Sequence, residues 1–396
     1  MEHRSIIVVG AGASGMAAAI AAAQTGAQVC VLEKSAKAGR SVMAAGNGRC
    51  NFANADLSPE RYNDPPFVAS TMGSDPLTPI LDLFGALGLW YIADDEGRLF
   101  PRSRAAASVL DVLLAAMDER GVELRLECPV SAIALRNGCW LVELANGTAL
   151  TCDALVWAAG GGTAAVPAVG AGLPQTPERV ALCPLATDPR PGKVLDGVRV
   201  ACAVTLRDGR SVVAERTGEV LFRPYGLSGI AVFDLSRLAH SGDTLVLDLL
   251  PDVDEAALTR LLEERHNRQS ARCATPAGRL TFLDGALHPK VGRFVMERLC
   301  GRGGERPIDA PRLARLLKGW EFTVAGTADE SHGQVTQGGL ATSAFDPLSL
   351  STSRAPGFFA CGEALDIDGE CGGLNLAWAW SSGMVAGVAA ARSVLA

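Results

Sequence analysis

The sequence predicts an α/β protein in which a parallel-sheet domain is interrupted by a second domain with a β-rich part and a helical part. The chain opens with alternating strand and helix patterns, and residues 326–396 return to the same style. Between these two segments the pattern changes to short β runs and then to a helical stretch rich in Arg and Leu. A length of 396 residues agrees with two domains, because one domain usually contains roughly 100–200 residues.

The N-terminal segment has the pattern of a β-α-β unit. Residues 5–9, Ser-Ile-Ile-Val-Val, form the continuous apolar run that is typical of a buried parallel strand. The Ala-rich stretch 13–25 contains no proline and is followed by Gly26, which predicts a helix that ends at a glycine cap. A second apolar run at 29–32 completes the unit.

A loop, a helix and a β-meander are expected next. Residues 35–55 combine small residues with Asn and Arg without periodicity, which indicates an ordered loop, and residues 105–120 have an amphipathic helix pattern. Short β runs follow from 122 to 158, interrupted by Asn-Gly pairs at 137–138 and 146–147. Because Asn-Gly between apolar runs is a strong hairpin signal, we expect these runs to pair with one another.

Three further segments complete this domain. The Pro- and Gly-rich residues 165–192 are typical of a crossover linker. An apolar strand is predicted at 357–361, and a long Ala-rich helix is predicted at about 375–394.

The inserted domain is predicted over residues 186–325. Its first part, about 193–250, is β-rich, and its second part, about 254–320, is helical. The segments 1–185 and 326–396 on either side would then form one discontinuous domain.

The composition argues against several classes of protein. The net charge of −7 and the pI near 5.4 disfavour a nucleic-acid-binding surface, which is usually basic. Eleven cysteines occur without a Cys-x-x-Cys pair, so we predict free thiols and no metal site. No signal peptide follows Glu2 and Arg4, and no apolar stretch reaches the ~20 residues of a membrane span. We therefore expect a soluble cytoplasmic protein without membrane or nucleic-acid partners.

A glycine-rich turn lies between the first strand and the first helix. Gly10, Gly12 and Gly15 form the pattern G-x-G-x-x-G, and Glu33 ends the next strand. Gly12 would let a pyrophosphate approach the backbone, the helix N–H groups would bind its charge, and Glu33 would accept hydrogen bonds from an adenosine ribose. A turn that serves packing alone is the alternative. The dinucleotide contacts predicted here are Gly10, Ala11, Gly12, Ala13, Ser14, Gly15 and Glu33.

A second segment near the C-terminus favours FAD over NAD as the dinucleotide. The strand at 357–361 runs into Gly362-Glu363, and a glycine loop then leads to the last helix. FAD is long and needs a second contact at its ribityl end, where the Glu363 carboxylate would accept hydrogen bonds. The N–H groups of Asn375, Leu376 and Ala377 would face the flavin pyrimidine oxygens. An ordinary strand–turn–helix is the alternative.

Three motifs together resemble the BaiN/YhiN-type flavoproteins, a family also described as NAD(P)/FAD-dependent or aminoacetone-oxidase-like oxidoreductases. They are Ile6–Gly15 with Glu33, the Gly-Asn-Gly-Arg-Cys-Asn segment 46–51, and the segment 362–383. The resemblance covers nearly the whole chain. It implies a glutathione-reductase-like Rossmann FAD-binding domain with an inserted β-rich plus helical domain. We expect the FAD to be non-covalent, because no motif positions a His or Cys for attachment.

Further cofactor contacts are predicted along the first domain. The loop 46–51 has small residues that let backbone approach the cofactor, and Arg49 offers a planar set of donors. A solvated loop is the alternative, and Cys50 and Cys371 are more simply structural thiols than redox partners. The additional predicted contacts are Lys34, Gly39, Arg40, Asn47, Gly48, Arg49, Cys50, Val130, Ala159, Gly160, Gly161, Gly362, Glu363, Asp366, Gly373, Asn375, Leu376 and Ala377.

Two residues are candidates for proton transfer. The chain has Arg223-Pro224-Tyr225 before Gly-Leu-Ser-Gly, where the family usually has Thr-His before Phe-Gly-Leu-Ser-Gly, so substrate recognition is expected in the insert. Tyr225 carries a phenol that can donate a proton, and packing at the domain boundary is its alternative role. His332 is the second candidate, although a lone histidine is usually structural.

These observations predict an FAD-dependent oxidoreductase in which the flavin supplies the reactivity and the protein supplies orientation. The resemblance implies reduction of an activated C=C bond of a small apolar substrate, with steroid- or bile-acid-like enones as one class. Oxidation of a small amine with formation of hydrogen peroxide is the first alternative, and a non-catalytic flavin-binding regulatory partner is the second. Only one dinucleotide fingerprint is present, so NAD(P)H would be a transient electron donor.

Overall fold

The computed structural model describes residues 2–328 and 333–396, which form two compact units. The first unit contains Met1–Arg179 and Val335–Ala396, and the second contains Val180–Gln334. The domain boundaries expected at 185/186 and 325/326 lie six and nine residues from these divisions.

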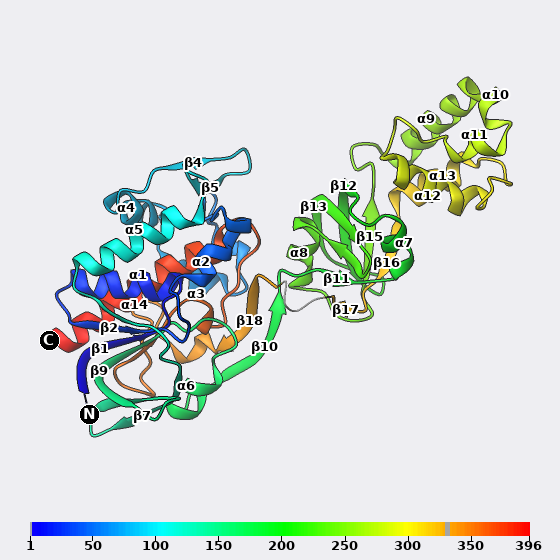
Figure 1. The fold of residues 1–396 in the computed structure, drawn as a ribbon. Helices are drawn as coiled ribbons and strands as arrows, with labels where there is room; N and C mark the ends of the chain where they lie inside the picture. Colours follow the sequence, from blue (N-terminus) through cyan, green and yellow to red (C-terminus); the bar gives the residue numbers. More distant parts are fainter. Residues whose placement is uncertain (1, 329–332) are drawn as a thin grey trace. The chain divides into compact units, whose positions relative to one another are not determined.

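The first unit is built on a seven-stranded sheet (Figure 1). Five of its strands run parallel to their neighbours, in the order β6-β2-β1-β9-β19. Strand β9 also pairs antiparallel with β8, and β8 pairs antiparallel with β7, which gives the predicted meander. The strands are β1 (Glu2–Val9), β2 (Val29–Leu32), β6 (Glu123–Arg125), β7 (Val130–Arg136), β8 (Cys139–Leu144), β9 (Ala149–Trp157) and β19 (Phe358–Ala360).

Helices α1 (Ala13–Gln24) and α14 (Leu374–Leu395) pack against each other on one face of this sheet (Figure 1). Small residues allow this close approach. A Cβ atom on Gly387 would lie 2.2 Å from the Ala18 carbonyl oxygen, so only glycine fits there. The first helix of the chain is thus packed against the last, and both ends of the sequence contribute to one core.

Smaller elements surround this core. A three-stranded sheet has the order β3-β5-β4, and strands β10 and β18 pair where the chain leaves and re-enters the first unit. These elements are α2 (Arg40–Ala44), β3 (Ala53–Asn54), α3 (Pro65–Met72), α4 (Thr78–Ala86), β4 (Tyr91–Ala93), β5 (Arg98–Pro101), α5 (Ala106–Glu119), α6 (Ala165–Gly170), β10 (Gln175–Ala181) and β18 (Val335–Leu340).

The second unit combines a seven-stranded sheet with a helical block and has its own hydrophobic core. Its sheet has the order β16-β15-β12-β13-β14-β11-β17, and the pairs described within it are antiparallel. The strands are β11 (Leu185–Ala186), β12 (Arg199–Asp208), β13 (Ser211–Arg223), β14 (Gly226–Ser228), β15 (Thr244–Asp248), β16 (Trp320–Thr323) and β17 (Gly326–Thr327). The helices are α7 (Pro189–Val194), α8 (Ile230–Ser236), α9 (Glu255–Arg268), α10 (Ser270–Cys273), α11 (Pro276–Leu280), α12 (Pro289–Cys300) and α13 (Ala310–Lys318).

Two expectations need correction. Residues 35–55 contain the short helix α2 and a 3₁₀ turn at Ala45–Gly48 instead of a plain loop, and these elements are too short to show a sequence period. The expected linker 165–192 contains α6, β10, β11 and most of α7. Within the part of the chain that the structure describes, no helix has the length and hydrophobicity needed to cross a membrane.

Candidate cofactor site

The three glycines of the N-terminal turn serve different purposes. Gly10 has a φ of +104°, and a Cβ atom there would lie 2.4 Å from the Ala158 carbonyl oxygen. A Cβ atom on Gly15 would lie 1.9 Å from the Gly10 carbonyl oxygen, so both positions exclude a side chain through packing. A Cβ atom on Gly12 would meet only the Ser41 hydroxyl, at 3.3 Å. Protein packing therefore does not require glycine at position 12, whereas a phosphate resting on the backbone would.

The N-terminus of α1 is suited to an anion. Its N-cap is Gly12, which supplies no side-chain acceptor, and its first turn contains no acidic residue. The first N–H groups of the helix thus lack the usual capping partner. With the helix dipole behind them, they fit a pyrophosphate.

Glu33 lies directly beyond the end of β2 and faces the glycine turn. One of its carboxylate oxygens accepts a hydrogen bond from the Ala11 N–H at 2.8 Å, and the other accepts from the Ser35 N–H at 2.8 Å. Each oxygen keeps a lone pair for a ribose hydroxyl. The Cys128 N–H donates to the Glu33 carbonyl at 2.8 Å, so the segment that leads into Val130 lies beside this end of the site.

The segment after β9 borders the glycine turn from the other side. The Ala158 N–H donates to the Val9 carbonyl at 2.9 Å, which fixes the start of the predicted residues 159–161. A Cβ atom on Gly161 would lie 2.3 Å from the Cβ atom of Thr336, so β18 approaches this turn closely. The predicted contacts from residues 10–15 and 159–161 are therefore brought together.

The N-terminus of α14 is a second uncapped helix start in the same unit. Its N-cap is Gly373, with a φ of +101°, and its first turn has no acidic residue. Cβ atoms on Gly383 and Gly387 would meet the carbonyl oxygens of Ser14 and Ala18, so α1 and α14 run in the same direction. Leu374 precedes Gly383 by nine residues, whereas Ala13 precedes Ser14 by one, which places the two helix starts about 12 Å apart along the axes at about 1.5 Å per residue. That separation suits a ligand with a pyrophosphate at one end and an electron-rich ring at the other.

Glu363 lies between these two helix starts in the chain's return segment. Burial raises the pKa of its carboxyl group to about 7, although the backbone N–H groups of Thr336 and Gly161 donate to it and oppose the shift. The preceding Gly362 is fixed by its own N–H, which donates to the Ser382 hydroxyl at 3.0 Å. Glu363 as a whole residue is half-buried.

The loop 46–51 is held in an unusual backbone conformation. Gly46, Asn47, Gly48 and Cys50 all have φ between +53° and +81°. The Arg49 side chain turns back on the protein, with its Nε donating to the Gly46 carbonyl at 3.3 Å and its guanidinium 5.6 Å from the Phe100 ring centroid. Cys50 is fully buried, which raises the pKa of its thiol to about 12 and agrees with a structural role.

Asn51 is a candidate site residue that the sequence prediction missed. Its side-chain Oδ1 is buried and accepts no hydrogen bond from the residues that the structure describes. A Cβ atom on Gly373 would lie 2.6 Å from this oxygen, so the unused acceptor sits beside the start of α14. A buried acceptor without a donor is costly, and an N–H or O–H group of a bound flavin would satisfy it. The Asn after Gly-Arg-Cys was the available signal.

Two of the predicted side chains already form hydrogen bonds with other groups of the protein. Asp366 accepts from the Thr176 hydroxyl at 2.7 Å and from the Gly338 N–H at 3.1 Å. Asn375 pairs its amide with the N–H and carbonyl of Gly369. These hydrogen bonds hold the loops around the site in place. The Gly39 N–H donates to the Ala11 carbonyl at 2.8 Å.

The other predicted residues differ in position. Lys34 and Arg40 are exposed next to this turn region, and Leu376 and Ala377 belong to the first turn of α14. Tyr225 lies in the second unit, at the tight turn between β13 and β14, and the Arg223 guanidinium lies 6.0 Å from its ring centroid. His332 lies outside the described residues.

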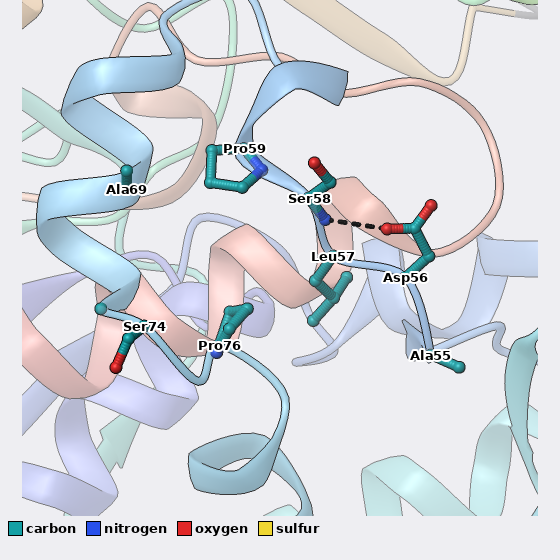
Figure 2. A pocket seen from close by; sticks show the side chains of 9 residues that line it. Ala55, Asp56, Leu57, Ser58, Pro59, Ala69, Ser74 and Pro76 are labelled. Carbon is teal, nitrogen blue, oxygen red and sulfur yellow. Dashed lines mark hydrogen bonds between the residues drawn. The ribbon is translucent and has the colours of Figure 1, made fainter.

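A surface hollow of about 590 Å³ lies elsewhere in the first unit (Figure 2). It is lined by residues 55–59 and by residues around the C-terminal end of α3, and the Ser58 N–H donates to the Asp56 carboxylate at 3.2 Å on its rim (Figure 2). None of the predicted cofactor residues lines it. The site described here is instead defined by two helix starts, their glycine loops and the acceptors between them.

Comparison with known proteins agrees with this geometry. Residues 4–389 match the family model described as the HI0933-like protein Rossmann domain. The chain belongs to this family. The predicted family resemblance, the Rossmann fold with its insertion and the oxidoreductase class are thereby confirmed, and the family supports a flavin cofactor.

Named relatives of this HI0933-like chain match over almost their whole length. It is 32% identical over 410 residues to a 3-dehydro-bile acid Δ(4,6)-reductase of Clostridium scindens, covering 97% of this chain and 98% of the relative. It is 29% identical over 406 residues to a ribosomal RNA dihydrouridine synthase of Escherichia coli, covering 96% of each. Among solved structures, the open conformation of a flavocytochrome c3 fumarate reductase has a TM-score of 0.53 at 15% identity, covering 100% of this chain and 79% of that chain. This likeness concerns the fold.

Proposed function

We propose that this protein is an FAD-dependent reductase that saturates a C=C bond conjugated to a carbonyl group. The observation that carries the proposal is the pair of full-length relatives, because their printed activities share one reaction type. A Δ4,6 double bond in a 3-dehydro bile acid is conjugated to a ketone, and the C5=C6 bond lost in dihydrouridine is conjugated to a carbonyl of the uracil ring. Relatives that bind the same cofactor in the same fold would catalyse the same type of reaction, while differences elsewhere in the protein would select different substrates.

FAD fits the site in the first unit without a covalent link. The uncapped start of α1 with Gly12 would hold the pyrophosphate, and Glu33 would hold the adenosine ribose. Glu363 would bind ribityl hydroxyls, and Asn51 would accept from an N–H or O–H group of the flavin half. When bound and reduced, FAD supplies a hydride from its N5 position.

The protein's own residues would then control charge and access. The positive start of α14 would favour negative charge on a flavin ring bound against it and would thereby stabilise the reduced form. The substrate carbonyl needs a proton at the carbon next to it, and we assign this task to the Tyr225 phenol, with His332 as the second candidate. NAD(P)H would bind transiently as the electron donor, because the sequence contains one dinucleotide fingerprint, which FAD would fill.

A small apolar enone is the first candidate substrate, by analogy with the bile-acid reductase. A uridine in RNA is the second candidate, and one feature of this chain favours it. The helical block 254–318 contains thirteen Lys or Arg residues and eight Asp or Glu residues, although the whole chain has a net charge of −7. Such a local excess of positive charge would attract a phosphate backbone.

The test uses the holoprotein with its flavin reduced under anaerobic conditions. A 3-keto-Δ4 steroid, a uridine-containing ribosomal RNA transcript and aminoacetone are mixed with it separately, and the return of the oxidised flavin absorbance is followed. Reoxidation by the enone or by the RNA, with the saturated product identified by mass spectrometry, supports the proposal and chooses between the substrates. Failure of both, together with peroxide formation from the oxidised holoprotein and the amine, would identify an oxidase instead.

A further inference from the structure

A cluster of three metal-ligating side chains lies at the far end of the main sheet from the glycine turn. His3 comes from β1, Cys139 from β8 and Asp153 from β9. Their ligand atoms all lie within 4.8 Å of one another, although the residues are far apart in the sequence. The register of the three strands brings these side chains together. His3 aligns with Thr151, two residues before Asp153, and Trp140, the residue after Cys139, aligns with Cys152, the residue before Asp153.

The distances match those expected around a tetrahedral zinc ion. Zinc–nitrogen and zinc–oxygen bonds of about 2.0–2.2 Å place two such ligands about 3.3 Å apart, and a zinc–sulfur bond of about 2.3 Å places sulfur about 3.6 Å from oxygen. In the structure the His3 Nε2 lies 3.1 Å from an Asp153 carboxylate oxygen, and the Cys139 Sγ lies 3.7 Å from the other. The two distances involve different Asp153 oxygens, so binding one ion requires the carboxylate to turn one oxygen toward both partners, within a cluster whose ligand atoms lie within 4.8 Å of one another.

A neighbouring hydroxyl orients the histidine ring. The second ring nitrogen of His3, Nδ1, lies 3.2 Å from the Thr151 Oγ1. If Nδ1 carries the proton and donates it to this oxygen, Nε2 is unprotonated, and its lone pair can bind a metal ion. Such an outer partner on a ligating histidine is a regular feature of metal sites and is independent of the three-ligand geometry.

We propose that His3, Cys139 and Asp153 bind one Zn²⁺ ion, with water in the fourth position. A nitrogen, a thiolate and a carboxylate form a ligand set that zinc accepts, and the half-exposed side chains of His3 and Asp153 leave the ion open to solvent. The site would cross-link three adjacent strands and fix the start of β1. Because β1 is eight residues long, it lies about 20 Å or more from the glycine turn at about 3.3 Å per residue, so its role would be structural.

The test uses the full-length holoprotein without an N-terminal tag, freed of metal by dialysis against a chelator. Zn²⁺ is titrated in competition with a chromophoric chelator, and Co²⁺ replaces it as the spectroscopic probe. We expect one equivalent of metal and, with Co²⁺, a near-ultraviolet band from the thiolate ligand. Cys139→Ser should remove that band and weaken Zn²⁺ binding at least tenfold. Thr151→Val should weaken it about 10–100-fold, as is usual for outer partners.

Cys128→Ser is the matched control, since Cys128 is half-buried like Cys139 but lies outside the cluster. It should keep the band and the Zn²⁺ affinity. Equal Zn²⁺ affinity in wild type and Cys139→Ser would overturn the proposal, as would loss of the band in Cys128→Ser. Thermal unfolding without metal checks that all variants fold, and added Zn²⁺ should raise the Tm of the wild type but not of Cys139→Ser.

Discussion

Gly12 is the glycine of the N-terminal turn at which the protein itself leaves room for a side chain. We expect Gly12→Val to lower FAD affinity by at least about a hundredfold, because the new side chain would occupy the place of the pyrophosphate while meeting only the Ser41 hydroxyl in the protein. Fluorescence titration of the apoprotein with FAD measures this, and circular dichroism checks the fold. Gly85→Val in α4 is the control, since nothing lies within 4 Å of a Cβ atom there. Unchanged FAD affinity in Gly12→Val would assign Gly12 to packing.

Tyr225 tests the proposed proton donor. Tyr225→Phe removes the hydroxyl and keeps the ring, so flavin content should stay unchanged while turnover falls about 10²–10⁴-fold. Steady-state reduction of the substrate identified by the flavin assay measures the loss. Tyr91→Phe, a half-exposed tyrosine of the first unit, should have wild-type turnover. Wild-type turnover in Tyr225→Phe would remove this phenol from the reaction.

Glu363 should make the stability of the apoprotein depend on pH. Its pKa is raised from 4.5 to about 7 by burial, so the folded state holds a proton that the unfolded state has released between these values. By linkage, stability is highest below pH 4.5 and falls by at most about 3 kcal/mol as the pH rises to 7. Glu363→Gln should remove this decline, so that its Tm rises relative to wild type as the pH increases. Parallel Tm curves for the two proteins would show that Glu363 is not the source.

The interface of α1 and α14 depends on glycines that α14 presents to the α1 backbone. Gly387→Ala should destabilise the protein by about 1–3 kcal/mol, because its Cβ would lie 2.2 Å from the Ala18 carbonyl oxygen and force the helices apart. Denaturant unfolding measures this loss. Gly85→Ala, in a helix position with open space, should be neutral or slightly stabilising. If Gly387→Ala left the free energy of unfolding as little changed as Gly85→Ala does, the two helices would accommodate the extra methyl group without loss of stability.

Elements with a strong local signal were predictable from the sequence. The strand at 29–32 was placed at its observed bounds, and Asn137-Gly138 adopts the two positive φ values of a tight hairpin turn, 52° and 82°. Contacts between distant segments were not predictable. Nothing local to Asn51 shows that its oxygen meets Gly373, and the meeting of His3 with Asp153 depends on strand register.

The two compact units divide the protein at neighbouring strands. A Cβ atom on Gly338 in β18 would lie 2.2 Å from the Pro177 carbonyl in β10, so the chain leaves and re-enters the first unit at one place. Each unit has its own hydrophobic core. The boundary therefore separates two hydrophobic cores. In the sequence, the only sign of it is a change in the secondary-structure pattern.

This arrangement predicts that the first unit can be made alone. Replacing residues 180–334 by a short Gly-Ser linker should preserve FAD binding within about tenfold, because every cofactor contact proposed here lies outside the deleted segment. Turnover should be lost with Tyr225. Fluorescence titration and the flavin reoxidation assay measure the two properties. A folded deletion variant that has lost FAD would show that the second unit contributes to cofactor binding.

Helix α14 also sets the order in which the protein can mature. Helix α14 and strand β19 lie far from residues 10–15 in the sequence, yet α14 packs against α1 and β19 pairs with β9 of the same sheet. The glycine turn is therefore synthesised long before the helix start that we propose for the flavin half of FAD. The nascent chain must keep the sheet position beside β9 open until β19 has been synthesised and can pair there.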